Sequence, residues 1–291
     1  MTERNPKPSK AERTAAAREQ ARALREAQKK KEQRNKLLVR WGVVVAVVAV
    51  LVIVALIVIN STRGGNGTEA QTGPAPANAN QYGGITLTST TSLEATEPFE
   101  VDVASLPEVP TEAVENPPVP PGIVPAAAPG DPIPVVVYAD VNCVHCADFD
   151  ETYKAQLATW LDAGDITLEY RTVAFLDRGS PTNYSSRGAN AAACVADTNP
   201  ESYWGFLSAI YGNYDNGELK NAELADLAES VGASAAADCI QNDGFRAFVN
   251  YTDRLARVDN VGGTPTVYVN GAEVSVTDFT SAVQTAVDAN K

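Results

Sequence analysis

The chain has 291 residues, enough for one or two domains, and a formal net charge of −13. Residues 1–40 carry 13 Lys and Arg against 5 Asp and Glu, whereas residues 60–291 carry 10 against 31. The acidic body excludes nucleic acid as an expected partner, because phosphates repel it, and a cationic head joined to an anionic body predicts two compartments.

Residues 1–40 are expected to form a basic cytoplasmic segment. Ala, Glu, Lys, Arg and Gln dominate from about residue 8 onward, and these are good helix formers. The apolar positions are mostly alanines, so the large heptad residues of a coiled coil are missing. The segment is interpreted as a solvated juxtamembrane helix, and its basic cluster at Lys29–Lys36 also favours contact with anionic membrane lipid.

Trp41–Ile59 is an uninterrupted apolar run, WGVVVAVVAVLVIVALIVI. At about 1.5 Å per residue a helix of this length spans roughly 28 Å, close to a hydrocarbon core of about 30 Å. A cleaved signal peptide is the alternative, but the leader is long for one and Asn60–Arg63 lacks a small-x-small cleavage site. We therefore expect a single-pass transmembrane helix at 41–59 in the cell membrane, with a cytoplasmic N-terminus and an extracytoplasmic C-terminal domain.

Residues 60–131 are rich in Gly, Asn, Thr and Pro. This composition predicts a disordered, partly polyproline-like linker. Two runs within it, Ile85–Thr90 and Phe99–Val103, alternate as strands do. The sequence leaves open whether these runs pack as an edge on the following domain or stay disordered.

Residues 132–291 have the size of a single folded domain. The apolar periodicities and turn signals predict a strand, a helix, a strand, a helical block, a hairpin and a final helix. This order gives an α/β fold whose elements are Pro134–Asp140, Cys143–Ala163, Ile166–Phe175, the helical insertion at about 179–258, Thr266–Asn270 with Ala272–Val276, and Thr277–Asn290.

The candidate chemistry lies in the segment Cys143-Val144-His145-Cys146. At the start of a helix, these two thiols are close enough to form a small disulfide. Cys143 lies at the helix N-terminus, where unpaired N–H groups and the helix dipole stabilise a thiolate. Cys143 is therefore the predicted nucleophile and the more shielded Cys146 the resolving thiol.

His145 is the only histidine of the chain. A protonated imidazole between the two cysteines would stabilise the thiolate further, which makes His145 a candidate tuning residue. The alternative is an exposed histidine without a role. The nearby Asp140, Asp148 and Asp150 act in the opposite direction, because carboxylates raise the pKa of a thiol.

Half of a zinc site is the structural alternative for a C-x-x-C pair. Such a site needs two more ligands close together, whereas Cys194 and Cys239 are separated from each other and from the pair. We therefore expect no metal and no cofactor.

The segment YADVNCVHC at residues 138–146 resembles the DsbA-like thiol-disulfide oxidoreductases of the thioredoxin superfamily. Asp140 fits the family's Y-x-D-F-x-C pattern, with Val141 replacing Phe. The segment VGGTPTVYVNG at residues 261–271 is similar to the family's G-T-P-T-x-x-V-N-G motif. The resemblance covers about 132–291 and implies a thioredoxin fold in which a helical cap is inserted between Cys146 and Pro265.

The resemblance also implies a cis bond at Thr264–Pro265, in a loop that faces the cysteines. Gly263, Thr264 and Pro265 would then form the substrate-binding loop, where the backbone of Thr264 pairs with an incoming substrate strand. An ordinary trans turn proline is the alternative.

A second cysteine pair, Cys194 and Cys239, lies in expected helices of the inserted block. Some family members carry a structural disulfide there, and an electron relay to the first pair is the alternative. The chain departs from the family at Val137, where several relatives carry a buried acid that assists proton transfer from the resolving thiol. The sequence leaves the route of that proton unassigned.

These observations predict an enzyme, a monomer that introduces disulfides into unfolded or reduced exported proteins. Its reoxidant, by resemblance, is a quinone-linked membrane enzyme of the DsbB or vitamin K epoxide reductase type. A disulfide isomerase or reductase on the same fold is the alternative in this class. A non-catalytic, membrane-tethered binding module is the alternative in another class.

Overall fold

The computed structural model describes residues 70–112 and 114–291. The chain divides between Gly65 and Asn66, and all described residues belong to the second unit, Asn66–Lys291. No helix within the described ranges has the length and apolar character needed to cross a membrane. The predicted basic segment 1–40 and the predicted span 41–59 lie outside the described residues.

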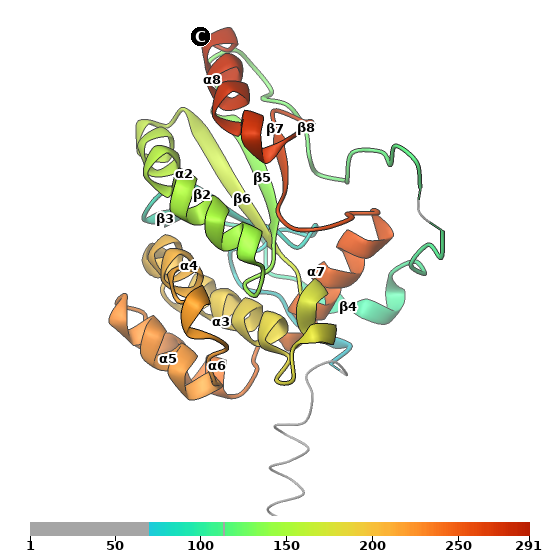
Figure 1. Cartoon of the computed structure of the whole chain (residues 1–291), viewed down its shortest axis with the longest axis vertical. Coiled ribbons are helices and arrows are strands. Elements are labelled where there is room, and N and C mark those ends of the chain that lie inside the picture. The colour runs from blue at the N-terminus through green and yellow to red at the C-terminus, as the bar shows by residue number, and fades with distance from the viewer. Residues whose placement is uncertain (1–69, 113) are drawn as a thin grey trace, which may run out of the picture. The chain divides into compact units, whose positions relative to one another are not determined.

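A six-stranded sheet forms the centre of the described unit (Figure 1). Its strand order is β3-β2-β6-β5-β7-β8, in which β5 and β6 run parallel and all other neighbours are antiparallel. The strands are β2 (Ile85–Ser89), β3 (Ser92–Leu93), β5 (Ile133–Ala139), β6 (Ile166–Thr172), β7 (Thr266–Val269) and β8 (Ala272–Val274).

The central strand β5 is buried on both faces, which explains its continuous apolar sequence. Successive side chains of a strand point to opposite faces. Val135 and Val137 accordingly join the large core beneath α2 (Val144–Ala163) and α8 (Phe279–Ala289), and Val136 and Tyr138 join a smaller core on the other face with Ala256 of α7 (Arg246–Val258). The sheet therefore has helices on both sides.

The helix α2 (Val144–Ala163) follows β5 directly and ends where Gly164 adopts a left-handed conformation with φ of 75°. Its buried face carries Phe149 and Trp160, whose rings pack against Phe279 at centroid distances of 5.2 and 6.2 Å. Phe279 opens the C-terminal helix α8 (Phe279–Ala289). These aromatic contacts fix α2, and with it the cysteines at its start, on the sheet.

Between β6 and β7 the chain forms a helical cap, which gathers beside one end of the sheet (Figure 1). Its first helix, α3, is almost entirely buried and rich in alanine, so that neighbouring helices can approach closely. The cap helices are α3 (Tyr184–Thr198), α4 (Tyr203–Gly212), α5 (Asn221–Ser230), α6 (Ala237–Gln241) and α7 (Arg246–Val258).

The prediction of a disordered linker over 60–131 is wrong for much of residues 70–131. The run at Ile85–Thr90 forms β2, which pairs with β6 so that Leu87 lies opposite Leu168. The strands β1 (Thr72–Pro74) and β4 (Glu100–Asp102) pair with each other and contact α7. Sheet hydrogen bonds and apolar burial therefore outweigh the linker-like composition of this segment.

The buried Arg171 of β6 connects the segment 70–131 to the sheet. Its side chain is only 1% exposed, and its guanidinium donates to the carbonyl of Pro121 at 3.0 Å and to the hydroxyl of Tyr138 at 2.8 Å. It forms an ion pair with Glu169 at 2.5 Å and lies 5.5 Å from the ring centroid of Tyr82. Two separate parts of the segment, around residues 82 and 121, thus converge on one buried cation.

Candidate active site

Cys143 and Cys146 lie where β5 passes into α2. Cys143 is the N-cap residue, with an extended backbone, and its carbonyl accepts from the N–H groups of Cys146 and Ala147 at 3.1 Å each. Both thiols are free and buried, with 6% of Cys143 and 2% of Cys146 exposed. The helix thus begins between the predicted nucleophile and the predicted resolving thiol.

The pKa of the Cys143 thiol is lowered from an ordinary value of 9.0 to about 5. The largest cause is a hydrogen bond from the Cys146 thiol, followed among the lowering effects by a hydrogen bond from the Thr264 side chain and by the backbone N–H groups of Cys146 and His145. Burial opposes these effects without cancelling them. Hydrogen bonds that favour the charged form lower a pKa in this way, so Cys143 carries a thiolate at neutral pH.

Cys146 behaves in the opposite way. Its pKa is raised well above the ordinary value, first by burial and then by the hydrogen bond to Cys143 and the negative charge on that residue. The two thiols of one helical turn thus differ: Cys143 is ionised at the helix start, and Cys146 is protonated and more deeply buried. This difference suits a nucleophile and a resolving thiol.

The loop before β7 reaches the same place from a distant part of the sequence. The Thr264–Pro265 peptide bond is cis, as the resemblance implied. In its protonated form the Cys143 thiol donates to the carbonyl oxygen of Thr264 at 3.3 Å, and the carbonyl of Gly263 accepts from the Thr266 hydroxyl at 2.9 Å. Because β7 pairs with β5, the sheet itself brings this loop beside the cysteines.

His145 lies on the surface beside this loop. Its Nδ1 is 3.7 Å from an oxygen of Asp148, and both side chains are largely exposed, at 76% and 67%. The contribution of His145 to the pKa of Cys143 comes from its backbone N–H. The tuning role predicted for its imidazole therefore stays a prediction.

A groove of about 400 Å³ runs past these residues. Phe149, Tyr153, Pro265 and Val276 give it apolar walls, and His145 and Thr264 lie at its cysteine end. A partly apolar groove whose wall includes Thr264, the residue in contact with Cys143, can hold an extended peptide without demanding a particular sequence.

Asp140 organises the loop that carries Cys143. Its side chain is fully buried and accepts from the N–H groups of Asn142 at 2.8 Å and Leu176 at 3.0 Å. Burial raises the pKa of Asp140 to about 6. The motif indicates the position of Asp140, but its role as an acceptor for the backbone N–H of Leu176, 36 residues along the chain, depends on the fold.

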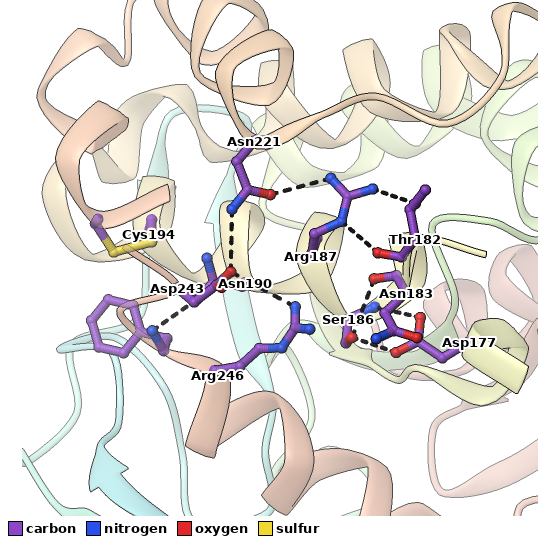
Figure 2. A network of polar contacts seen from close by, with 12 residues as sticks. Asp177, Thr182, Asn183, Ser186, Arg187, Asn190, Cys194, Asn221, Asp243 and Arg246 are labelled. Atoms are coloured by element: carbon purple, nitrogen blue, oxygen red, sulfur yellow. Dashed lines mark hydrogen bonds and ion pairs between the residues drawn. A yellow bond between two sulfur atoms is a disulfide. The ribbon is translucent and has the colours of Figure 1, made fainter. Parts of the chain in front are cut away.

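The predicted disulfide between Cys194 and Cys239 is present and joins α3 to α6, with a Cα–Cα distance of 5.7 Å. It lies beside a network of buried polar groups (Figure 2). In this network Asn190 accepts from the N–H of Phe245 at 2.8 Å, and Arg246 lies 3.9 Å from Asp243. The cross-link therefore closes one side of the cap rather than the active site.

The 3-10 helix Phe175–Gly179 connects the cap to the loop that carries Cys143. Leu176 donates to Asp140, and the next residue, Asp177, accepts from both the N–H and the hydroxyl of Ser186 (Figure 2). The first cap helix is thus anchored to the residue three positions before Cys143. Sequence reasoning missed this connection, because nothing marks Asp177 as the partner of a serine in α3.

Among residues 70–112 and 114–291 there is no cluster of three or more His, Cys, Asp or Glu side chains placed to hold a metal ion. The four cysteines lie in two separate pairs, of which one is bonded. The candidate site described above consists of two thiols, a buried carboxyl and backbone groups.

Comparisons with known proteins identify the family of the folded domain. A family model described as thioredoxin matches residues 128–289. The serine/threonine-protein kinase PknE of Mycobacterium tuberculosis is 30% identical over 161 residues, which are 50% of this chain and 28% of the kinase. Disulfide bond formation protein D of Bacillus subtilis is 25% identical over 146 residues, which are 48% of this chain and 64% of that protein. The chain thus spans less than two thirds of the length of either curated relative.

Among solved structures, oxidised DsbA of Mycobacterium tuberculosis is 30% identical with a TM-score of 0.48. The match covers 58% of this chain and 91% of that structure.

Proposed function

The chain belongs to the thioredoxin family through residues 128–289, and from this premise we propose that it is an extracytoplasmic thiol-disulfide oxidoreductase that introduces disulfides into exported proteins. The observation that carries the proposal is the placement of Cys143 at the start of α2, against the carbonyl of Thr264, with its pKa lowered to about 5. A stabilised thiolate favours the reduced enzyme, which makes the oxidised pair a stronger oxidant.

In the proposed reaction the enzyme starts with a Cys143–Cys146 disulfide. A substrate thiolate attacks the sulfur of Cys143, the bond between the two cysteines breaks, and Cys146 leaves with the electron pair. A second substrate thiolate then attacks the substrate sulfur of the mixed disulfide and releases Cys143 as a thiolate. The substrate is oxidised by two electrons and the enzyme reduced by two.

The loop at Gly263, Thr264 and Pro265 is proposed to hold the substrate during this exchange. The carbonyl of Thr264 faces the reacting sulfur, where an extended substrate segment can also add its backbone hydrogen bonds. The groove beside Phe149 and Pro265 offers the segment an apolar surface. Backbone and apolar contacts of this kind suit unfolded chains of many sequences.

The location and partners are part of the same proposal. The charge-free apolar run at 41–59 and the basic residues before it support a single-pass anchor whose C-terminal part lies outside the cytoplasm. An enzyme that is reduced in each cycle needs a reoxidant, and a quinone-linked membrane enzyme would supply one beside the anchor.

Trapping in cells tests the activity. The full chain with Cys146→Ala should accumulate mixed disulfides between Cys143 and exported proteins, because the resolving thiol is missing, and Cys143→Ala should accumulate none. Non-reducing electrophoresis followed by identification of the adducts reads the result. Absence of adducts in the Cys146→Ala strain would favour a tethered binding module over an enzyme.

The reduction potential of the Cys143–Cys146 pair tests the direction. A value near about −120 mV marks an oxidant, whereas one near about −270 mV marks a reductase. The full chain, equilibrated in detergent with glutathione or dithiothreitol buffers, gives this value from the fraction of free thiol. A strongly reducing value would replace the oxidase by the reductase or isomerase alternative.

A further inference from the structure

A second cavity, of about 330 Å³, opens beside the cysteines on the side of α2 that contacts the cap helix α4 (Figure 1). Its walls come from α2, from the end of α4 and from the 3-10 turn Tyr214–Asn216 that follows. Val144, the residue directly after Cys143, lines this cavity and is 42% exposed. The cavity therefore begins next to the candidate nucleophile, where a side chain of a bound substrate can enter it.

The walls of this cavity are strongly acidic. Among its lining residues, four carboxylates stand against one ammonium: Asp148, Asp150, Glu151 and Asp215 against Lys154. Three of the carboxylates are exposed, and only Asp150 is buried. A hollow lined by one sign of charge focuses its field on the opposite sign. The electrostatics of the cavity therefore favour a positively charged group.

The buried Asp150 distinguishes this cavity from an ordinary acidic surface. Its side chain is 3% exposed, and its Oδ1 accepts from the hydroxyl of Ser208 at 3.1 Å. Its Oδ2 lies 3.8 Å from the ammonium of Lys154, beyond hydrogen-bond distance, and the Lys154 side chain is 47% exposed to competing water. Burial of a carboxylate with one oxygen short of donors is unfavourable. A cation that enters the cavity would supply the missing donors.

The arrangement of the carboxylates selects an organic cation rather than a metal ion. Nowhere in residues 70–112 and 114–291 do three His, Cys, Asp or Glu side chains lie close enough together to hold a metal. Val144, Ala147 and Tyr211 also line the cavity and add apolar atoms to its wall. Lys and Arg side chains place their methylene stems on apolar surface and their charged ends among polar groups. An ammonium or guanidinium on such a stem matches this combination.

The acidic cavity adjoins the apolar groove that passes Thr264 and Pro265. Asp148 lines both the cavity and the groove, and its carboxylate lies 3.7 Å from Nδ1 of His145 in the groove wall. Successive side chains of an extended peptide point to opposite sides. A peptide that lies in the groove can therefore direct one side chain past Asp148 into the cavity. This continuity favours a side chain of the substrate over a free amine.

We infer that this cavity is a subsite for a lysine or arginine side chain of the protein substrate, close to the cysteine that reacts with Cys143. The inference rests on the proposed function and adds a substrate preference to it. The substrate cation pairs with Asp150, Lys154 turns toward solvent, and the stem of the entering side chain lies against Val144.

Activated peptides test the preference. Each peptide carries one cysteine as a mixed disulfide with 5-thio-2-nitrobenzoate and one variable residue, which is Lys, Gln or Glu. Attack by Cys143 of the reduced full chain in detergent forms the bond to the peptide sulfur and releases the coloured thiolate, which gives a second-order rate constant. With the variable residue near the cysteine, Lys should react about tenfold faster than Glu, the effect of a hydrogen bond to a charged, buried group. The ratio should decline as the residue is moved away from the cysteine.

Variants assign the preference to the cavity, and the Lys-to-Glu ratio cancels any effect that they have on the thiolate itself. Asp150→Asn should lower the ratio at the favoured position at least about threefold. Lys154→Gln should raise it, because a competing ammonium is removed. The matched control Asp226→Asn removes an exposed carboxylate of the cap helix α5, outside the cavity, and should leave the ratio unchanged.

A double variant guards against a folding defect at the buried position. Glu151→Gln combined with Asp215→Asn changes only exposed carboxylates of the cavity and should also lower the ratio about threefold. If neither this variant nor Asp150→Asn lowers the ratio, the inference is overturned.

The peptides themselves give two further outcomes against the inference. A ratio below about twofold at every position would show that the cavity binds no substrate cation. A preference of equal size at near and distant positions would arise from the overall negative charge of the chain and not from the cavity. Both results leave the proposed function intact, whereas absence of coloured thiolate with every peptide would refute the proposed function itself.

Discussion

Removal of the Cys194–Cys239 cross-link should lower the free energy of unfolding substantially. The two cysteines are 45 residues apart in sequence. In the chain-entropy model, breaking a cross-link between residues that far apart stabilises the unfolded state by about 4 kcal/mol. At about 2–4 °C per kcal/mol for a domain of 150–250 residues, the midpoint of thermal unfolding should fall by about 8–16 °C.

The single variants Cys194→Ala and Cys239→Ala distinguish cross-linking from packing. Either one breaks the same bond, so each should lose nearly the full amount, and the double variant should lose little more. Circular dichroism of the full chain during heating, together with urea titration, measures all three. Small losses that add up in the double variant would mean that the sulfurs contribute by packing and would refute the cross-link argument.

The same variants test the role of this pair in electron transfer. The disulfide joins two helices of the cap and lies beside the buried polar network around Asn190 and Arg246 (Figure 2). With 5,5′-dithiobis(2-nitrobenzoate), the reduced Cys143–Cys146 pair releases one equivalent of coloured thiolate when Cys143 attacks and a second when Cys146 resolves the mixed disulfide. Both releases should stay unchanged in the double variant, measured well below its unfolding temperature. Loss of the second release would favour the electron-relay alternative.

Three other predictions concern the nucleophile, the buried cation of the sheet and the packing of α3. Because the pKa of Cys143 is lowered from 9.0 to about 5, its thiolate should persist at every pH above that value, and alkylation of Cys143 in the reduced original chain by iodoacetamide, followed by mass spectrometry, should fall about tenfold per pH unit below it; a midpoint near 9 would contradict the argument that the Cys146 thiol and the N–H groups at the helix start stabilise the thiolate. Arg171→Leu leaves the partly buried Glu169, which is 12% exposed, without its ion pair and should cost about 3–5 kcal/mol of unfolding free energy in urea titration, whereas a loss below about 1 kcal/mol would contradict the role of this cation. In Gly188→Ala the added Cβ would lie 2.5 Å from Cγ2 of Val141, and this overpacking should cost about 1–3 kcal/mol; a thermal midpoint equal to that of the original chain would show that α3 can shift away.

The domain between residues 132 and 291 could be predicted because its signals are local. The apolar run of β5, the two cysteines at the start of α2 and the hairpin around Asn270 each depend on a few neighbouring residues. The motif resemblance added the cis bond at Pro265, which the structure contains. Contacts between these parts then follow from the order of strands in the sheet.

The segment before the domain could not be predicted in the same way. Its Pro- and Gly-rich composition is typical of a linker, and its strands have only two to five residues. Whether such strands form depends on an unpaired neighbouring strand, here the outer edge of β6. It also depends on the buried Arg171, which contacts the Tyr82 ring and donates to the carbonyl of Pro121. No local sequence pattern indicates the open strand edge or the buried cation.

The candidate site likewise combines features that local sequence predicts with features that depend on long-range packing. The roles proposed for Cys143 and Cys146 follow from their positions at a helix start, whereas the burial of Asp150 depends on α4 packing over α2. A carboxylate in an exposed helical turn and a carboxylate beneath another helix look alike in sequence. Their pKa values differ because only the second is removed from water.

The pairing of β2 with β6 has a practical consequence for work on an isolated domain. A fragment that starts at residue 132, as the composition suggests, would leave the backbone N–H and C=O groups along one side of β6 without their partners and would remove the carbonyl of Pro121 from Arg171. An open strand edge of this kind invites pairing between molecules. A fragment for soluble production should therefore begin upstream of β1, at or before residue 70, so that β2 of each molecule pairs with the edge of its own β6.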